Sequence, residues 1–222
     1  MQRNTFKGHS CLYTLLFSLF LLCGSYSANA QQLKDLFVHM PDSLSPLLTE
    51  VNRADCIDFL ESKMKAVVDN RLGGKSEMTD LSLDYLRLQL TAQTSWQMKL
   101  LPVNDSIKVI CTIATACAPA CDSFVRFYDL QWKEIPSYSF LLMPTTKDFF
   151  VKNDTLTVDE YDTALNKADI CLIKAELNKK DNGLQFTLTT PDYLDKETAE
   201  KLKPFLRREL SFFWKEGRFN LK

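Results

Sequence analysis

The spacing of apolar residues indicates helices in the part of the chain that follows residue 30. Residues 33–51 predict one or two short helices. Asn52, with Asp55 three residues on, resembles a capping box and predicts the start of a further helix that runs to about Lys65. A break with turn chemistry follows over residues 71–76.

Beyond this break the pattern changes to a period of two, which is typical of strands. Apolar and polar residues alternate over residues 86–91 and 96–100, as expected of strands with one buried face. Residues 107–116 and 123–130 are apolar more continuously and predict central strands buried on both faces. Because the linkers between these four segments are short, an antiparallel meander is expected.

The last third of the chain contains both helical segments and segments with the period of two that is typical of strands. Residues 158–167 predict a short helix, and residues 171–177 and 184–188 predict a hairpin whose turn contains Gly183. Asp195 predicts the cap of a helix that ends near Lys203, before a proline. The tail over residues 205–219 is expected to close the sheet as one last strand.

These elements predict an α+β fold, with a mainly antiparallel β-sheet, N-terminal helices, and one or two helices packed on the sheet. No Gly/Ser-rich or Pro-rich linker divides the chain, so residues 31–222 are expected to form a single domain. Both predicted hairpins are followed by an acidic-aromatic corner, which suggests a diverged internal duplication with halves 31–136 and 137–222.

The first 30 residues have the features of a cleavable export signal. Two basic residues precede an apolar run over residues 11–23, which is shorter than the ~20 residues that span a bilayer. Ala28-Asn29-Ala30 is an A-x-A cleavage box, so cleavage is predicted between Ala30 and Gln31. The alternatives are a retained anchor and a lipoprotein modified at Cys23. No transmembrane span is expected in the mature chain.

The charge balance of the predicted mature chain argues against binding to nucleic acids. Removal of the signal takes two of the 27 basic residues and none of the 28 acidic ones, which leaves a net charge of −3. The charges are interspersed along the chain, whereas a nucleic-acid binder carries a basic face. No nucleic-acid partner is therefore expected. Because of the export signal, the mature chain is expected in the periplasm, outside the cell or in association with the outer membrane.

Five cysteines remain after the predicted cleavage. Cys117 and Cys121 flank a short Pro-containing turn between two predicted strands, so a disulfide between them is expected, with a contribution of about 2 kcal/mol or less. A thiol-redox site is the alternative, although C-x-x-x-C is not the spacing of thioredoxin-like enzymes. The remaining cysteines fall on apolar faces and are expected to pack in the core: Cys56, Cys111 and Cys171.

Catalytic and cofactor motifs are scarce. His39 is the single histidine of the predicted mature chain, which disfavours Ser-His-Asp catalysis, Cys-His catalysis and polyhistidine metal sites. Gly74-Lys75-Ser76 imitates the end of a P-loop, but the earlier glycine that the motif requires is Asp69. No cofactor is therefore expected. A carboxylate-based hydrolase stays open, because the distance between two carboxyls depends on the tertiary structure.

Four segments resemble one family of exported proteins. They are LFVHMPDSL at residues 36–44, NR at 52–53 with DCIDF at 55–59, NRLGGKSEM at 70–78, and CAPACD at 117–122. With them the chain resembles a family from Bacteroidetes, the domain-of-unknown-function family numbered 3256. The resemblance implies export, an envelope setting and one shared domain, and it implies no activity.

The same resemblance implies a modification. Exported proteins of such bacteria are O-glycosylated at Asp-Ser or Asp-Thr that precedes a small or aliphatic residue. Four sites fit this pattern: Ser43, Ser106, Thr155 and Thr163.

Together these observations favour an exported envelope protein of unknown activity, a non-enzymatic binding or assembly module. Its expected partner is an envelope protein or a surface glycan. The first alternative is a carboxylate-based hydrolase. The second and less favoured alternative is a thiol-redox protein that uses Cys117 and Cys121.

Overall fold

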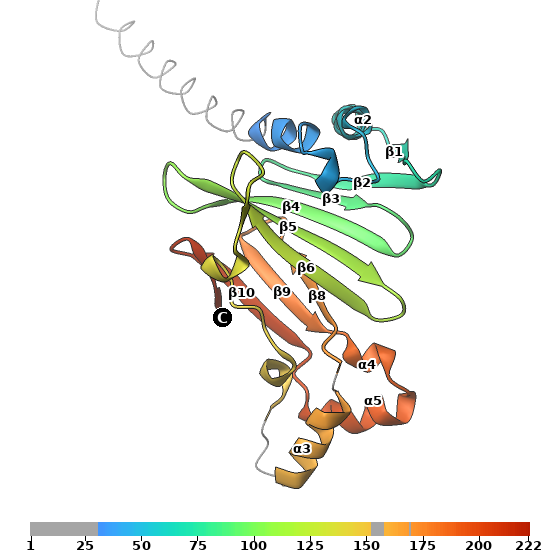
Figure 1. Cartoon of the computed structure of the whole chain (residues 1–222), viewed down its shortest axis with the longest axis vertical. Coiled ribbons are helices and arrows are strands. Elements are labelled where there is room, and N and C mark those ends of the chain that lie inside the picture. Colours follow the sequence, from blue (N-terminus) through green and yellow to red (C-terminus); the bar gives the residue numbers. More distant parts are fainter. Residues whose placement is uncertain (1–30, 152–157, 169) are drawn as a thin grey trace, which may run out of the picture.

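The computed structural model describes residues 31–151, 158–168 and 170–222, so the predicted signal peptide and Ala30 lie outside the described residues. Two antiparallel sheets form the framework (Figure 1). The larger sheet contains seven strands in sequence order, β1 (Ala66–Asp69), β2 (Lys75–Leu81), β3 (Tyr85–Gln89), β4 (Thr94–Pro102), β5 (Lys108–Cys117), β6 (Cys121–Tyr128) and β7 (Glu134–Ile135). The smaller sheet contains β8 (Ile173–Leu177), β9 (Gly183–Leu188), β10 (Glu209–Lys215) and β11 (Arg218–Leu221). The predicted α+β class and the antiparallel arrangement are confirmed.

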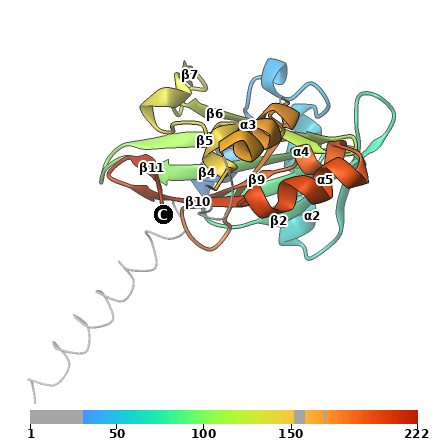
Figure 2. The ribbon, with the colours of Figure 1, turned by 90° about the horizontal axis from the view of Figure 1, so that it is seen from below.

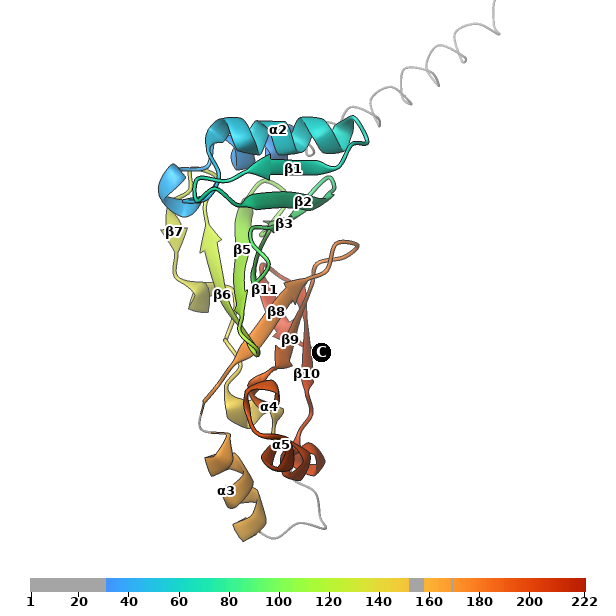
Figure 3. The same ribbon diagram turned by 90° about the vertical axis from the view of Figure 1, so that its right-hand side faces the viewer.

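Helices cover one face of the larger sheet. Residues 31–38 are helical, and helix α2 (Glu50–Glu61) follows and lies against β1 and β2 (Figure 3). The core beneath them joins apolar side chains of these helices, such as Phe37 and Cys56, to side chains of the sheet, such as Met98. The predicted N-terminal helices are thus confirmed, and the structure places them on the sheet.

The opposite face of the larger sheet packs against the smaller sheet. Their shared core contains Ile113 and Phe127 from one sheet and Phe186 and Leu210 from the other. Three further helices gather at the far end of the smaller sheet, as the view from that end shows (Figure 2): α3 (Val158–Lys167), α4 (Thr190–Tyr193) and α5 (Lys196–Leu202). The molecule is therefore layered as helices, large sheet and small sheet, with a second helical group at one end.

Side chains of the larger sheet form hydrogen bonds with the edge of the smaller sheet that has no neighbouring strand. β8 is an edge strand, and its N–H groups at Ile173, Ala175 and Leu177 have no partner strand on that side. Each of them donates to a side-chain oxygen instead, at 3.3, 2.9 and 3.0 Å respectively, the acceptors being Asp122, Ser123 and Gln97. A row of polar side chains thus takes the place of a neighbouring strand and provides acceptors for these three N–H groups.

A buried lysine completes this junction. The side chain of Lys99 on β4 is 1% exposed, and its Nζ donates to the carbonyl oxygen of Asn178, just after β8, at 3.1 Å. The same ammonium pairs with a carboxylate oxygen of Asp84 at 3.1 Å and lies 5.7 Å from the ring centre of Tyr85. Burial of the charge is tolerable because a carboxylate and a carbonyl surround it.

Several predicted boundaries need correction. α2 begins behind Thr49, whose hydroxyl accepts from the N–H of Asn52, so Asn52 is the third helical residue and not the cap. The sequence did not predict β1 and β2, because the polar residues of β2 hide its period of two. The predicted break is the turn of the hairpin that these two strands form, where Gly73 has a φ of +78°. The tail contains two strands and not one, joined at Glu216 and Gly217 with φ of +53° and +75°.

The boundary between the two sheets lies close to that between the predicted halves. The larger sheet ends at Ile135 and the smaller one begins at Ile173. The sheets differ in size, seven strands against four, although each is a sequential antiparallel meander. The single domain and the internal duplication stay predictions.

Ser123→Ala tests the bonds at the edge of β8. We expect the free energy of unfolding to fall by about 1–3 kcal/mol, because the N–H of Ala175 would be buried without an acceptor. Urea-induced unfolding of the wild type and the variant measures this difference in free energy. The control is Ser211→Ala, the same change on an exposed position of β10, with an expected effect within about 0.5 kcal/mol. Equal effects of the two substitutions would contradict the role given to Ser123.

Candidate functional site

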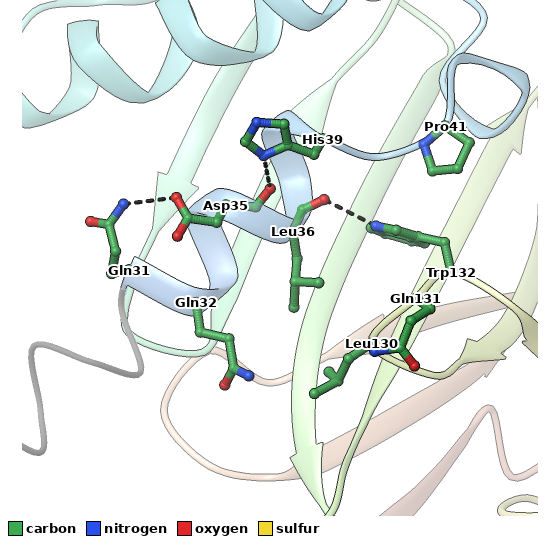
Figure 4. A pocket seen from close by; sticks show the side chains of 9 residues that line it. All are labelled: Gln31, Gln32, Asp35, Leu36, His39, Pro41, Leu130, Gln131 and Trp132. Carbon is green, nitrogen blue, oxygen red and sulfur yellow. Dashed lines mark hydrogen bonds between the residues drawn. The ribbon is translucent and has the colours of Figure 1, made fainter.

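The candidate site is an open pocket between the N-terminal segment and the turn that joins β6 to β7 (Figure 4). It has a volume of about 950 Å³. The N-terminal segment contributes Gln31, Gln32, Asp35, Leu36, His39 and Pro41, and the turn contributes Leu130, Gln131 and Trp132. The lining therefore combines an aromatic and aliphatic wall with amide, carboxylate and imidazole groups.

Trp132 is held in place as one wall of the pocket. Its indole Nε1 donates to the carbonyl oxygen of Leu36 at 3.1 Å (Figure 4). The centre of its ring lies 5.4 Å from that of Tyr128. The indole N–H is thus satisfied inside the protein. What remains available to a ligand is the apolar surface of the ring.

The turn that carries Trp132 has an unusual backbone. Trp132 has a φ of +62°, in the left-handed region that residues other than glycine seldom adopt. The carboxylate of Asp129 stabilises this turn by accepting from the N–H groups of Gln131 and Lys133, both at 2.9 Å. Backbone strain of this kind is found at ligand-binding positions more often than elsewhere.

Arg53 fixes the other side of the pocket. Its side chain on α2 is 1% exposed, and its guanidinium donates to three backbone carbonyls at 2.7–2.9 Å, those of Val38, Met40 and Leu48. It also donates to the carboxylate of Asp42 at 3.2 Å. These bonds tie down residues 38–48 and thereby place His39 and Pro41 at the pocket.

Most polar side chains of the pocket are exposed, and some of them bond to one another or to the backbone. The amide of Gln31 donates to the carboxylate of Asp35 at 2.8 Å, and the Nδ1 of His39 lies 2.8 Å from the carbonyl oxygen of Asp35. The side chain of His39 is 69% exposed, and its Nε2 lies 3.8 Å from a carboxylate oxygen of Glu50. Among the described residues that line the pocket, Asp35 is the one carboxylate. The described lining therefore offers one carboxylate, one imidazole and several amide groups to a ligand.

The predicted cysteine pair lies away from this pocket. Cys117 and Cys121 form a disulfide that joins the ends of β5 and β6. The pocket lies beyond the other end of β6, after Tyr128, so the structure does not bring the two together. Within the described part of the chain, no cluster of three or more His, Cys, Asp or Glu residues could hold a metal ion.

The other cysteines divide into two buried and one exposed. Burial raises the pKa of Cys56 to about 11 and raises the pKa of Cys111 further, so both thiols stay protonated. Cys171 is exposed, so the prediction that it packs in the core is wrong. It precedes β8, at the point where the chain enters the smaller sheet, and the alternation that begins at Ile173 does not extend to it.

The predicted glycosylation sites do not gather around the pocket. Ser43 is exposed in a helical turn over Asp42–Leu44, Ser106 is exposed in the turn between β4 and β5, and Thr163 is exposed on α3. Thr155 lies outside the described residues. Gln31, predicted as the first mature residue, lines the pocket, and Ala30 is not described.

Sequence reasoning missed Trp132 and Gln131 as site residues. The acidic-aromatic corner after the first predicted hairpin is Tyr128-Asp129-Leu130, and its Asp129 is a turn signal only. Nothing in the local pattern shows that this turn meets residues about 100 positions earlier, because that contact depends on the packing of the helix at 31–38 on the sheet.

Asp42→Asn tests the electrostatic support of the pocket. Hydrogen bonds from Arg71 and then from Arg53 lower the pKa of Asp42 below its ordinary value. The ionised carboxylate of Asp42 therefore stabilises the folded protein above pH ~4, the pKa of Asp in the unfolded chain. This stabilisation is lost as the pH falls through the lower pKa of Asp42 in the folded protein. We expect Asp42→Asn to lower the melting temperature at pH 7 and the difference to vanish toward pH ~2. Asp69→Asn removes an exposed ion pair to Lys75 and should change little at either pH. An equal effect of both substitutions would refute the assignment.

The helices in the described ranges 31–151, 158–168 and 170–222 include none that is long and apolar enough to cross a membrane. No curated protein matches the chain. A solved domain of an uncharacterized protein from Porphyromonas gingivalis W83 is similar to it, with a TM-score of 0.76 and 25% identity over 86% of this chain and 98% of that one. The family model described as protein of unknown function (DUF3256) matches residues 25–219, and the chain belongs to that family.

Proposed function

We propose that this chain is an exported, non-enzymatic binding module that recognises a sugar ring of a surface glycan in the pocket beside Trp132. Export rests on the signal-like first 30 residues and the A-x-A box before Gln31. The binding role rests on one observation: a rigidly held indole faces a set of exposed amide and carboxylate groups across an open pocket.

This combination matches the chemistry of a pyranose. A sugar ring has an apolar face of C–H groups, which packs on an aromatic ring, and a rim of hydroxyls, which need donors and acceptors. Trp132 offers the aromatic surface, while the side chains of Gln131, Gln32 and Asp35 offer both donors and acceptors. The open form of the pocket suits one residue of a longer chain, with the rest of the glycan outside.

The geometry supports this proposal over the two alternatives. A glycoside hydrolase needs two carboxyls about 5–10 Å apart across the substrate. In the described lining of the pocket, Asp35 has no second carboxylate opposite it. A thiol-redox function would operate at the Cys117–Cys121 disulfide, which lies at the opposite end of β6 from this pocket.

Binding to sugars and its dependence on the pocket are measurable together. The exported protein is screened against an array of bacterial surface glycans, and the dissociation constant of each hit is measured by calorimetry. We expect Gln131→Ala to weaken binding roughly tenfold and Trp132→Ala to weaken it further. Tyr138→Ala is the control, an exposed aromatic outside the pocket, and should bind as wild type. No bound glycan, or equal loss in all three variants, would contradict the proposal.

We also propose that the exposed Asp-Ser and Asp-Thr positions of the native protein are O-glycosylated. Ser43, Ser106 and Thr163 present their side chains to solvent, as modification requires. The intact mass of protein purified from its native host should exceed the polypeptide mass by one or more glycans. Substitution of these three residues by Ala, with Thr155→Ala added, should remove the excess. The bare polypeptide mass in the wild type would refute the idea.

A further inference from the structure

A second pocket, the outer pocket, lies on the outer face of the smaller sheet. This face is turned away from the larger sheet, and the described helices lie at the end of the smaller sheet rather than on it (Figure 3). The outer pocket has a volume of about 830 Å³, within the range of small-ligand pockets. Its lining includes Asp181, Gly183, Gln185, Ser211 and Phe213, so it extends from the turn after β8 across β9 and β10.

Phe213 provides an exposed aromatic surface in the outer pocket. Burial alternates along β10, with Leu210 and Phe212 in the core and Ser211 and Phe213 on the outer face. The side chain of Phe213 is not covered by the sheet, and the residue is 40% exposed. Its cross-strand partner on β9 is Gly183, which has no side chain to fill the space beside the ring. A flat ligand can therefore lie against the ring and the neighbouring strand.

Two exposed polar side chains lie beside this aromatic ring. Ser211 and Gln185 are cross-strand partners on β10 and β9, and both are exposed on the outer face. Neither side chain has a hydrogen-bond partner among the described residues. A hydroxyl and an amide together provide donors and acceptors. Residues two positions apart on a strand are about 7 Å apart, so these groups lie where the rim of a sugar ring stacked on Phe213 would be.

The two carboxylates of the described lining differ in what they already bind. Glu176 pairs with Arg87 at 3.3 Å and with Lys174 at 2.8 Å, so cations of the protein already neutralise it. Asp181 accepts from the N–H of Gly183 at 2.7 Å through its Oδ1. This oxygen lies 2.7 Å from the position that a Cβ of residue 183 would take, so the carboxylate is on the outer face. Its other oxygen is available to accept a hydrogen bond from a ligand hydroxyl.

We propose that the outer pocket is a second sugar-binding pocket, which holds a pyranose ring of a glycan against the ring of Phe213. Asp181, Gln185 and Ser211 form hydrogen bonds with the hydroxyls at the rim of the sugar. The inference rests on the ligand class of the proposed function. It is supported by the similar chemistry of the two pockets, since each combines an aromatic surface, a carboxylate acceptor and a glutamine amide.

The two pockets lie on opposite sides of the molecule. The pocket beside Trp132 lies on the face of the larger sheet that the N-terminal helices cover, and the outer pocket lies on the far face of the smaller sheet. Because the two sheets are packed between them, each pocket can bind a separate glycan chain. The protein then bridges two chains, and its attachment to a surface that carries many chains is strengthened by multivalency.

The experiment uses the full chain with its own leader, exported by its host and labelled with nitrogen-15 for NMR spectroscopy. The probes are maltotetraose, cellotetraose and chitotetraose. We expect one of them to shift the amide signals of Gly183 and Gln185 in the wild type and in Trp132→Ala alike. Phe213→Ala should weaken this binding roughly tenfold, because the stacking surface is lost. Glu209→Ala is the matched control, an exposed residue on the same face of β10 and outside the lining.

A second measurement tests the bridging directly. Beads coated with the probe that binds should be clumped by the wild type and by Glu209→Ala, and not by Trp132→Ala or Phe213→Ala. Urea-induced unfolding of each variant shows that it is folded, and Gln185→Ala provides a second substitution in the outer pocket that removes no aromatic ring.

The outcomes separate this inference from the proposed function. No shift at Gly183 and Gln185 with any probe, or wild-type affinity in Phe213→Ala and Gln185→Ala, overturns the inference. The proposed function stands in that case if Trp132→Ala still weakens binding. Binding that Phe213→Ala removes and Trp132→Ala leaves unchanged supports the outer pocket and contradicts the proposed role of Trp132.

Discussion

The structure depends on the way in which the edge of one sheet is bound to the face of another. Strand edges require partners for their backbone groups, and β8 finds them in Asp122, Ser123 and Gln97 rather than in another strand. Lys99 adds a donor for the carbonyl of Asn178. These directional bonds fix the smaller sheet on the larger one, while the apolar core between them supplies most of the stabilisation without setting the register.

Apolar packing and directional hydrogen bonds also have separate roles on the other face of the larger sheet. Apolar side chains of residues 31–38 and of α2 pack on the sheet, and the buried guanidinium of Arg53 then fixes the irregular segment between them through backbone carbonyls. The pocket exists because this segment and the turn at Trp132 are each held independently and meet at the bond from Trp132 to Leu36. Its walls are therefore held by internal hydrogen bonds, although most of its polar groups are exposed.

The N-terminal helix links the proposed export to the proposed binding site. Removal of a signal peptide after Ala30 would place the new chain end at the rim of the pocket, where Gln31 and Asp35 lie. A new α-amino group at that end would then change the local charge, since a helix N-terminus is sensitive to a single positive group. The proposed cleavage and the proposed binding would thus involve the same residues. Neither the family nor the similar Porphyromonas structure gives these residues an assigned role.

Local patterns in the sequence determined the class of the fold, strands β3–β6, the hairpin β8–β9 and the cap of α5 at Asp195, because alternation and capping involve neighbouring residues. They also predict an export signal, which is read from the chain without reference to its fold. Tertiary structure alone decided that Gln97 and Lys99, polar members of an alternating strand, are buried at the sheet junction. It alone brought Trp132 to Gln31. Periodicity shows that a face is buried, whereas the identity of what covers it is set by contacts between residues far apart in the chain.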